Sequence, residues 1–87
     1  PNVFTPDNEG PELNNYFKPV VTDASAYGVK VFNRWGEKMW ESEDPNESWD
    51  GTFKGVDCEA GVYLYVLRVE NHANKEYEFS GTVTLIR

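Results

Sequence analysis

Apolar and polar residues alternate along much of the chain, and short glycine-bearing turns interrupt the alternation. The period-two runs that stand out are residues 26–34, 37–42, 61–70 and 77–86. A period of two is typical of strands, because successive side chains of a strand point to opposite faces of a sheet. No segment has the 3.6-residue period of a helix. The pattern therefore predicts an all-β domain with antiparallel strands.

The same alternation assigns faces to the strands. In the run 61–70 both faces are apolar, which predicts a central strand that is covered on each side for part of its length. In the run 77–86 the glycine Gly81 allows a bend or a bulge. In the first strong run Tyr27, Val29 and Val31 share one face, and Lys30, Phe32 and Arg34 share the other. In the last run the side chains expected to face inward are Tyr77, Phe79, Val83 and Leu85.

Weaker signals complete the predicted sheet. Residues 3–5 form a candidate edge strand, and residues 16–21 form another that Pro19 interrupts. A short strand is expected at Thr52 and Phe53, a loop over residues 55–61, and a hairpin loop over residues 71–74. About seven short strands in one small domain predict an immunoglobulin-like antiparallel β-sandwich, although the Cys…Trp…Cys signature of antibody domains is absent.

Composition narrows the possible functions. Eighty-seven residues make one domain, and an aromatic content of 15% supplies material for its core. The net charge of −7, with only eight Lys and Arg, argues against a nucleic-acid partner and against anionic membrane surfaces. The single cysteine, Cys58, excludes an internal disulfide. No apolar run approaches the roughly 20 residues of a membrane-spanning helix.

Two of the three tryptophans, Trp35 and Trp49, lie beside turn glycines. A large ring at such a turn is expected to pack over the end of the sheet, as core or as a cap. In the turn after Trp49, the Asp50 carboxylate is expected to bond backbone N–H groups, and Gly51 to adopt a positive φ.

Taken in order, residues 1–6, 16–19, 32–37, 49–51, 61–65 and 80–87 resemble the gliding motility-associated C-terminal domain, the type B sorting domain of the Bacteroidota type IX secretion system. The likeness covers the whole chain. Its motif residues, which we interpret as mostly structural, are Asn33, Arg34, Trp35, Gly36, Trp49, Asp50, Gly51, Gly61, Tyr63 and Gly81.

The resemblance implies a non-catalytic address that takes its cargo from the periplasm through the outer-membrane translocon, to the cell surface or the medium. It also implies a PorP/SprF-like outer-membrane partner beside the translocon components. The chain is then expected to be a monomeric C-terminal sorting domain, residues 1–87, cut from a much longer secreted or surface protein.

The opening loop departs from the family. The family sequence Thr-Pro-Asn-Gly-Asp-Gly-x-Asn-Asp looks like a cation-binding loop, whereas this loop is longer, rearranged and stiffened by Pro11. Its oxygen donors suit Ca²⁺, but the strict Asp-x-Asx-x-Asx-Gly spacing is absent, so a metal site is not favoured and no cofactor is expected. The candidate donors are Asp7, Glu9, Glu12, Asn14 and Asn15. Cys58 takes the place of a family leucine as a small buried apolar residue.

Two other functions remain open at this point. Trp35, Trp40 and Trp49 together would suit a platform for sugars, as in carbohydrate-binding modules, and the domain would also suit an inert spacer in an adhesin stalk. Catalysis is not indicated. The only histidine, His72, lies in a predicted loop, and the sequence spacing suggests no nucleophile or carboxylate held against it for catalysis. A domain this small also has little room for a catalytic cleft.

Overall fold

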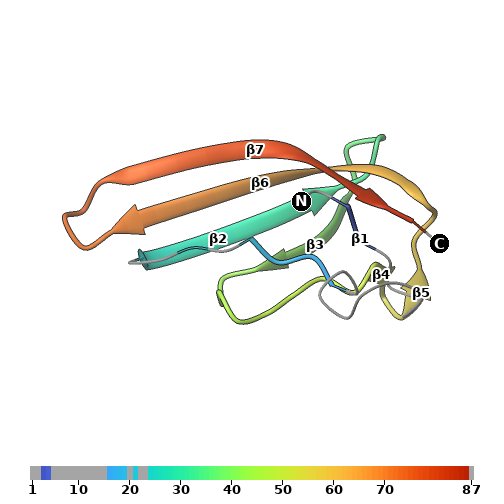
Figure 1. Cartoon of the computed structure of the whole chain (residues 1–87), viewed down its shortest axis with the longest axis horizontal. Coiled ribbons are helices and arrows are strands. Elements are labelled where there is room, and N and C mark those ends of the chain that lie inside the picture. The colour runs from blue at the N-terminus through green and yellow to red at the C-terminus, as the bar shows by residue number, and fades with distance from the viewer. Residues whose placement is uncertain (1–2, 5–15, 20, 22–23, 87) are drawn as a thin grey trace.

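A computed structural model describes residues 3–4, 16–19, 21 and 24–86 (Figure 1). This described part of the chain contains strands and no helix, which confirms the all-β class. The strands are β1 (Val3–Phe4), β2 (Ala24–Phe32), β3 (Lys38–Ser42), β4 (Thr52–Phe53), β5 (Val56–Asp57), β6 (Gly61–Asn71) and β7 (Glu76–Leu85).

Five of the strands form one sheet in the order β1-β7-β6-β2-β3, and β4 and β5 form a separate small hairpin. β6 is central, as predicted, and it pairs antiparallel with β2 and with β7. β2 and β3 make the predicted hairpin, with a register shift between Val31 and Phe32. β1 runs parallel to the end of β7, where Val3 and Phe4 pair with Thr84 and Leu85.

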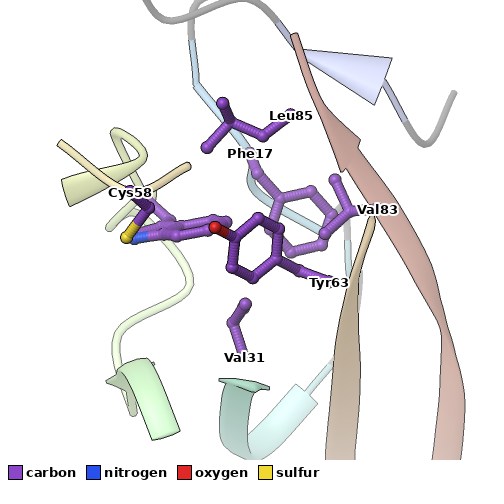
Figure 2. Packing of buried hydrophobic residues seen from close by; sticks show 7 residues of the cluster. Phe17, Val31, Cys58, Tyr63, Val83 and Leu85 are labelled. Carbon is purple, nitrogen blue, oxygen red and sulfur yellow. The ribbon is translucent and has the colours of Figure 1, made fainter. Parts of the chain in front are cut away.

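The main hydrophobic core lies on one face of this sheet. Val31, Tyr63 and Val83 come from the sheet, and the segments that cover it bring Phe17, Trp49 and Cys58. Figure 2 labels Phe17, Val31, Cys58, Tyr63, Val83 and Leu85, and these side chains point toward one another from both layers. The Trp49 ring is 1% exposed and meets Tyr63 edge-on, with the ring centroids 5.2 Å apart. Trp49 and Cys58 are therefore core residues, as predicted.

A second cluster continues along the same face with Tyr27, Val29, Leu67 and Val69, and Trp40 and Tyr65 pack against both clusters. The shared face predicted for Tyr27, Val29 and Val31 on β2 is confirmed, and the structure shows that this face is buried. At the end of the sheet that holds this cluster, however, Tyr77 and Phe79 on β7 are 40% and 53% exposed, so the prediction that they are buried is wrong. They share a face with the buried Val83 and Leu85, but the described covering segments leave this part of β7 uncovered.

The opposite face of β6 also differs from the prediction. Val62 and Leu64 are 56% and 45% exposed, so this face is not covered as the apolar pattern suggested. Periodicity shows which residues share a face, but a face is buried only where a second layer lies over it. The described second layer lies over one side of the sheet.

Two segment predictions also need correction. Residues 16–19 do not form a strand. Within this described segment, Phe17 makes an isolated β-bridge with Trp49. The predicted loop 55–61 contains the strand β5. The covering layer is thus the chain around Phe17 together with the β4–β5 hairpin.

Candidate functional site

The turn that follows Trp49 is closed by the Asp50 side chain. Asp50 Oδ1 accepts hydrogen bonds from Thr52 N at 3.0 Å and from Thr52 Oγ1 at 2.7 Å. Gly51 has φ 81°, in the left-handed region that favours glycine. The Trp49 Nε1 group donates to the carbonyl oxygen of Thr52 at 3.0 Å. Both expectations for this turn are confirmed.

Backbone hydrogen bonds of this turn also connect it to the other segments of the covering layer. Phe17 N donates to the Trp49 carbonyl oxygen at 2.9 Å, and Trp49 N donates to that of Phe17 at 2.8 Å. Cys58 N donates to the Gly51 carbonyl oxygen at 2.8 Å. Trp49 and Gly51 are both buried and pack inside the domain, whereas Asp50 between them is exposed.

The turn between β2 and β3 is closed by Asn33 instead. Its Oδ1 atom accepts from Trp35 N and from Glu37 N, each at 2.9 Å, and its Nδ2 group donates to Glu37 Oε1 at 3.0 Å. Backbone bonds add to these, from Asn33 N to the Glu37 oxygen at 2.9 Å and from Gly36 N to the Asn33 oxygen at 3.0 Å. Gly36 has φ 83°. One amide side chain thus fixes the whole turn.

Trp35 projects from this turn with 73% of its surface exposed. The Arg34 guanidinium carbon lies 5.0 Å from the ring centroid, a cation–π contact. The prediction that Trp35 packs as core or cap is therefore wrong. Hydrogen bonds of Asn33 hold the turn down, so the turn does not depend on burial of the ring.

Beside Trp35 lies a hollow of about 360 Å³, between the Asn33 turn, the β4–β5 hairpin and the start of β6. Exposed apolar side chains gather around it: Trp35, Phe53, Val56 and Val62 are 73%, 37%, 68% and 56% exposed. We call these four residues the Trp35 surface. Grouped apolar exposure of this kind makes the Trp35 surface a candidate interaction site.

Sequence reasoning missed Phe53, Val56 and Val62 as members of this surface. A signal for the β4–β5 hairpin was present in Lys54-Gly55, because a glycine in a two-residue loop suits a tight hairpin turn with positive φ. Lys54 and Gly55 have φ 54° and 81°. The turn brings Phe53 opposite Val56.

The remaining family motif residues make contacts within the fold. The Tyr63 hydroxyl donates to the carbonyl oxygen of Glu59 at 2.6 Å, and Gly61 has φ 150°. Gly81 lies under the Tyr65 ring, since a Cβ atom at residue 81 would meet Tyr65 Oη at 2.8 Å. The β6–β7 register continues past Gly81 unchanged, so of the bend or bulge that the glycine allows, the structure has no bulge. The glycine permits the close approach of the ring.

The three tryptophans do not form the platform considered for sugars. Trp49 is in the core, Trp40 is half-buried between the two clusters, and Trp35 alone is exposed. His72 is exposed in the loop between β6 and β7. The candidate Ca²⁺ donors of the opening loop lie outside the described residues. Within the described part no group of three His, Cys, Asp or Glu side chains is placed to hold a metal.

Charged side chains pair on the surface. Arg68 Nη2 contacts Glu78 Oε2 at 2.7 Å and Arg68 Nε lies 3.6 Å from Glu76 Oε1. The hydrogen bond with Glu78, and then the nearby carboxylates, hold the pKa of Arg68 above its ordinary value. Lys38 bonds Glu41 at 2.6 Å and lowers the pKa of that carboxyl. None of the described elements is a helix that could cross a membrane.

The described chain is therefore a small all-β domain, with motif residues in its core and an exposed aromatic turn. The model of one family, the CHU_C type IX secretion signal domain, matches residues 1–85, and the chain belongs to that family. It is a C-terminal signal domain of type IX secretion, a non-catalytic family whose cargo is exported to the cell surface or the medium. No curated protein matches the chain.

Proposed function

We propose that the type IX secretion machinery recognises this domain as a folded surface, in which Trp35 is the main contact. The supporting observation is how the motif residues divide. Trp49, Gly51 and Tyr63 are buried, whereas Trp35 is 73% exposed on a turn that Asn33 holds in place. A partner can touch Trp35 in the native state, and the buried motif residues act through the fold.

Trp35 has the properties of an interface hot spot. Tryptophan is enriched among the residues that dominate binding energy, especially beside a pocket or hollow. The Asn33 hydrogen bonds order the turn before binding, so little further conformational entropy is lost when a partner docks. The neighbouring Phe53 and Val56 extend the apolar contact around the ring.

The partners that we propose are translocon components and a PorP/SprF-like outer-membrane protein. Both are suggested by the resemblance to type B sorting domains. In this proposal residues 1–87 are one monomeric C-terminal sorting domain of a longer exported protein. The described sheet and its covering hairpin would then be part of an immunoglobulin-like sandwich.

The experiment is to fuse the domain to a periplasmic reporter and to score surface display beside the stability of each purified variant. Trp35→Ala should leave the unfolding free energy within about 0.5 kcal/mol of the parent, as is usual at exposed sites, and yet block display. Trp35→Phe, which keeps an aromatic ring on the same turn, should retain display. Display of folded Trp35→Ala at the parent's level would overturn the role of this ring.

The folded-surface proposal has its own test. Trp49→Ala should cost about 3–5 kcal/mol, as for other buried aromatic truncations, and should block display because the domain unfolds. Trp49 is fully buried, so its loss removes no contact with a partner in the native state. If unfolded Trp49→Ala is displayed as well as the parent, the machinery recognises a linear peptide and the proposal fails.

A further inference from the structure

β7 is an edge strand over most of its length. One side pairs with β6 along the whole strand, whereas on the other side β1 reaches only Thr84 and Leu85. Among the described residues, 76–83 therefore have no strand on their outer side, and Figure 1 shows β7 along the upper boundary of the sheet. The outward backbone N–H and C=O groups of such an edge are a template for another strand.

The two edges of the sheet differ in how they are protected. The β3 edge has five residues, carries Lys38 in an ion pair with Glu41, and adjoins a register shift. Lysine side chains, short length and irregular register are among the devices that discourage strand addition. β7 has ten residues, contains no lysine or proline, and keeps its register with β6 throughout. The β7 edge is thus the one open to a further strand.

The side chains of this edge alternate in character. Tyr77 and Phe79 are stacked on one face, with ring centroids 6.4 Å apart and planes 16° apart, and they are 40% and 53% exposed. Glu76 and Glu78 lie on the other face and share the single guanidinium of Arg68. Two carboxylates against one cation leave a negative charge on that face.

We propose that residues 76–82 of β7 dock an extended segment of a partner protein, in which apolar and basic residues alternate, as an added strand. Its apolar side chains would pack on Tyr77 and Phe79, and its basic side chains would lie beside Glu76 and Glu78. In strand addition, backbone hydrogen bonds supply affinity and alternate side chains supply specificity.

The negative charge of Glu76 and Glu78 favours a basic partner segment over a second copy of the chain. Antiparallel pairing of two β7 strands would place the acidic faces of both copies on the same side of the joined sheet. Each copy carries a net charge of −7, so this pairing is opposed by like-charge repulsion. A basic strand relieves the same charge instead of doubling it. In the cell this segment belongs to the secretion machinery, a step that rests on the proposed function.

The first test uses the purified domain and a ten-residue peptide in which Val and Lys alternate. We expect slowed amide hydrogen exchange for residues 76–82 and weaker binding as salt rises, because exposed charge pairs are screened. A Val and Glu peptide of the same length should not bind. Absence of protection at millimolar Val–Lys peptide, or protection confined to other strands, would overturn the proposal.

Variants on the two faces of β7 test the apolar contacts and the charged contacts of the peptide separately. Replacing both Tyr77 and Phe79 by Ser should weaken peptide binding roughly tenfold or more. Leu64→Ser, which removes a side chain of similar exposure on the opposite face of the sheet, should leave binding unchanged. Glu76→Gln with Glu78→Gln should weaken binding and remove most of its salt dependence. These side chains are all exposed, so the variants should remain folded. Equal peptide binding by all of them would contradict strand docking.

Sedimentation and reporter display complete the design. If the domain alone sediments as a dimer that Phe79→Ser dissociates, the edge serves a second copy and the proposed occupant is wrong. In cells, the double Tyr77 and Phe79 variant should lose display while Leu64→Ser keeps it. If the double variant is displayed normally and Trp35→Ala is not, the edge is unused for export and the proposed function still stands. Normal display of both would count against both.

Discussion

Replacing Gly81 by alanine tests the most specific contact within the sheet. Gly81 is paired with Tyr65 across β6 and β7, and the Tyr65 ring lies directly over it. An added Cβ atom would stand 2.8 Å from Tyr65 Oη and 2.9 Å from two ring carbons. Carbon atoms at rest are about 3.5–4.0 Å apart, so the ring must move.

The cost follows from what the ring touches. Tyr65 packs against both hydrophobic clusters, and its centroid is 5.4 Å from that of Phe17. Moving it disturbs the contact between the sheet and its covering layer. Overpacking of this kind costs about 1–3 kcal/mol, so Gly81→Ala should lower the unfolding free energy by that amount. Urea denaturation followed by Trp49 fluorescence would measure it, because Trp49 is buried in the native state.

A double-mutant cycle provides the control. In a Tyr65→Ala background the ring is gone, so the added methyl group meets no obstacle. Glycine within a strand is destabilising by roughly 0.5–1 kcal/mol relative to alanine, and Gly81→Ala should therefore stabilise this background. The effect of one substitution is expected to change sign. An equal loss of stability in both backgrounds would refute the steric explanation for Gly81.

Other predictions concern the turns, a buried phenol and the opening loop. Gly51→Val should cost roughly 1–3 kcal/mol in urea titrations, because a β-branched residue is strained at φ 81°. Burial, and then the charge of Asp44, raise the pKa of Tyr27 above 10.0. The neutral phenol is thus favoured in the fold, and this stability is complete below pH 10 and lost as pH rises through the raised pKa. Tyr27→Phe should show a smaller loss of stability between pH 9 and 12, roughly spanning tyrosine titration. Among described residues Tyr27 Oη has no hydrogen-bond partner, so Tyr27→Phe should cost little at pH 7. Millimolar Ca²⁺ should leave the melting temperature unchanged, whereas a micromolar site in residues 7–15 would add roughly 4 kcal/mol.

Periodicity predicted the sheet well because alternation is a local property of each strand. The strands β2, β3, β6 and β7 lie where the period-two runs lie, and the central place of β6 followed from its two apolar faces. Burial was predicted less well because it depends on a second layer from distant residues. Tyr77 and Phe79 obey the pattern of β7, and yet no described segment covers them.

The turns at Trp35 and Trp49 also show that burial of a side chain cannot be predicted from local sequence. Trp35 and Trp49 each lie near a turn glycine, and the sequence assigned both to packing. Asp50 and Asn33 each close their turn with a side-chain oxygen, so the local chemistry of the two turns is alike. The difference is in position, since Trp49 bonds to the chain around Phe17 and is held against the core. Long-range pairing of this kind cannot be predicted from the sequence of the turn alone.

Some motif residues are buried, such as Trp49 and Tyr63, whereas Trp35 is exposed. This difference decides how export data on the domain must be analysed. A small domain has about 5–15 kcal/mol of stability, and a change at Trp49 or Tyr63 consumes much of it. Display of such variants should follow the folded fraction alone. Changes at Trp35 or Phe79 leave the core intact, so any loss of display there reports a lost contact. Plotted against unfolding free energy, buried variants should fall on one curve, and contact variants should fall below it. If every variant lies on that single curve, neither the Trp35 surface nor the β7 edge touches the export machinery, and export depends on folding alone.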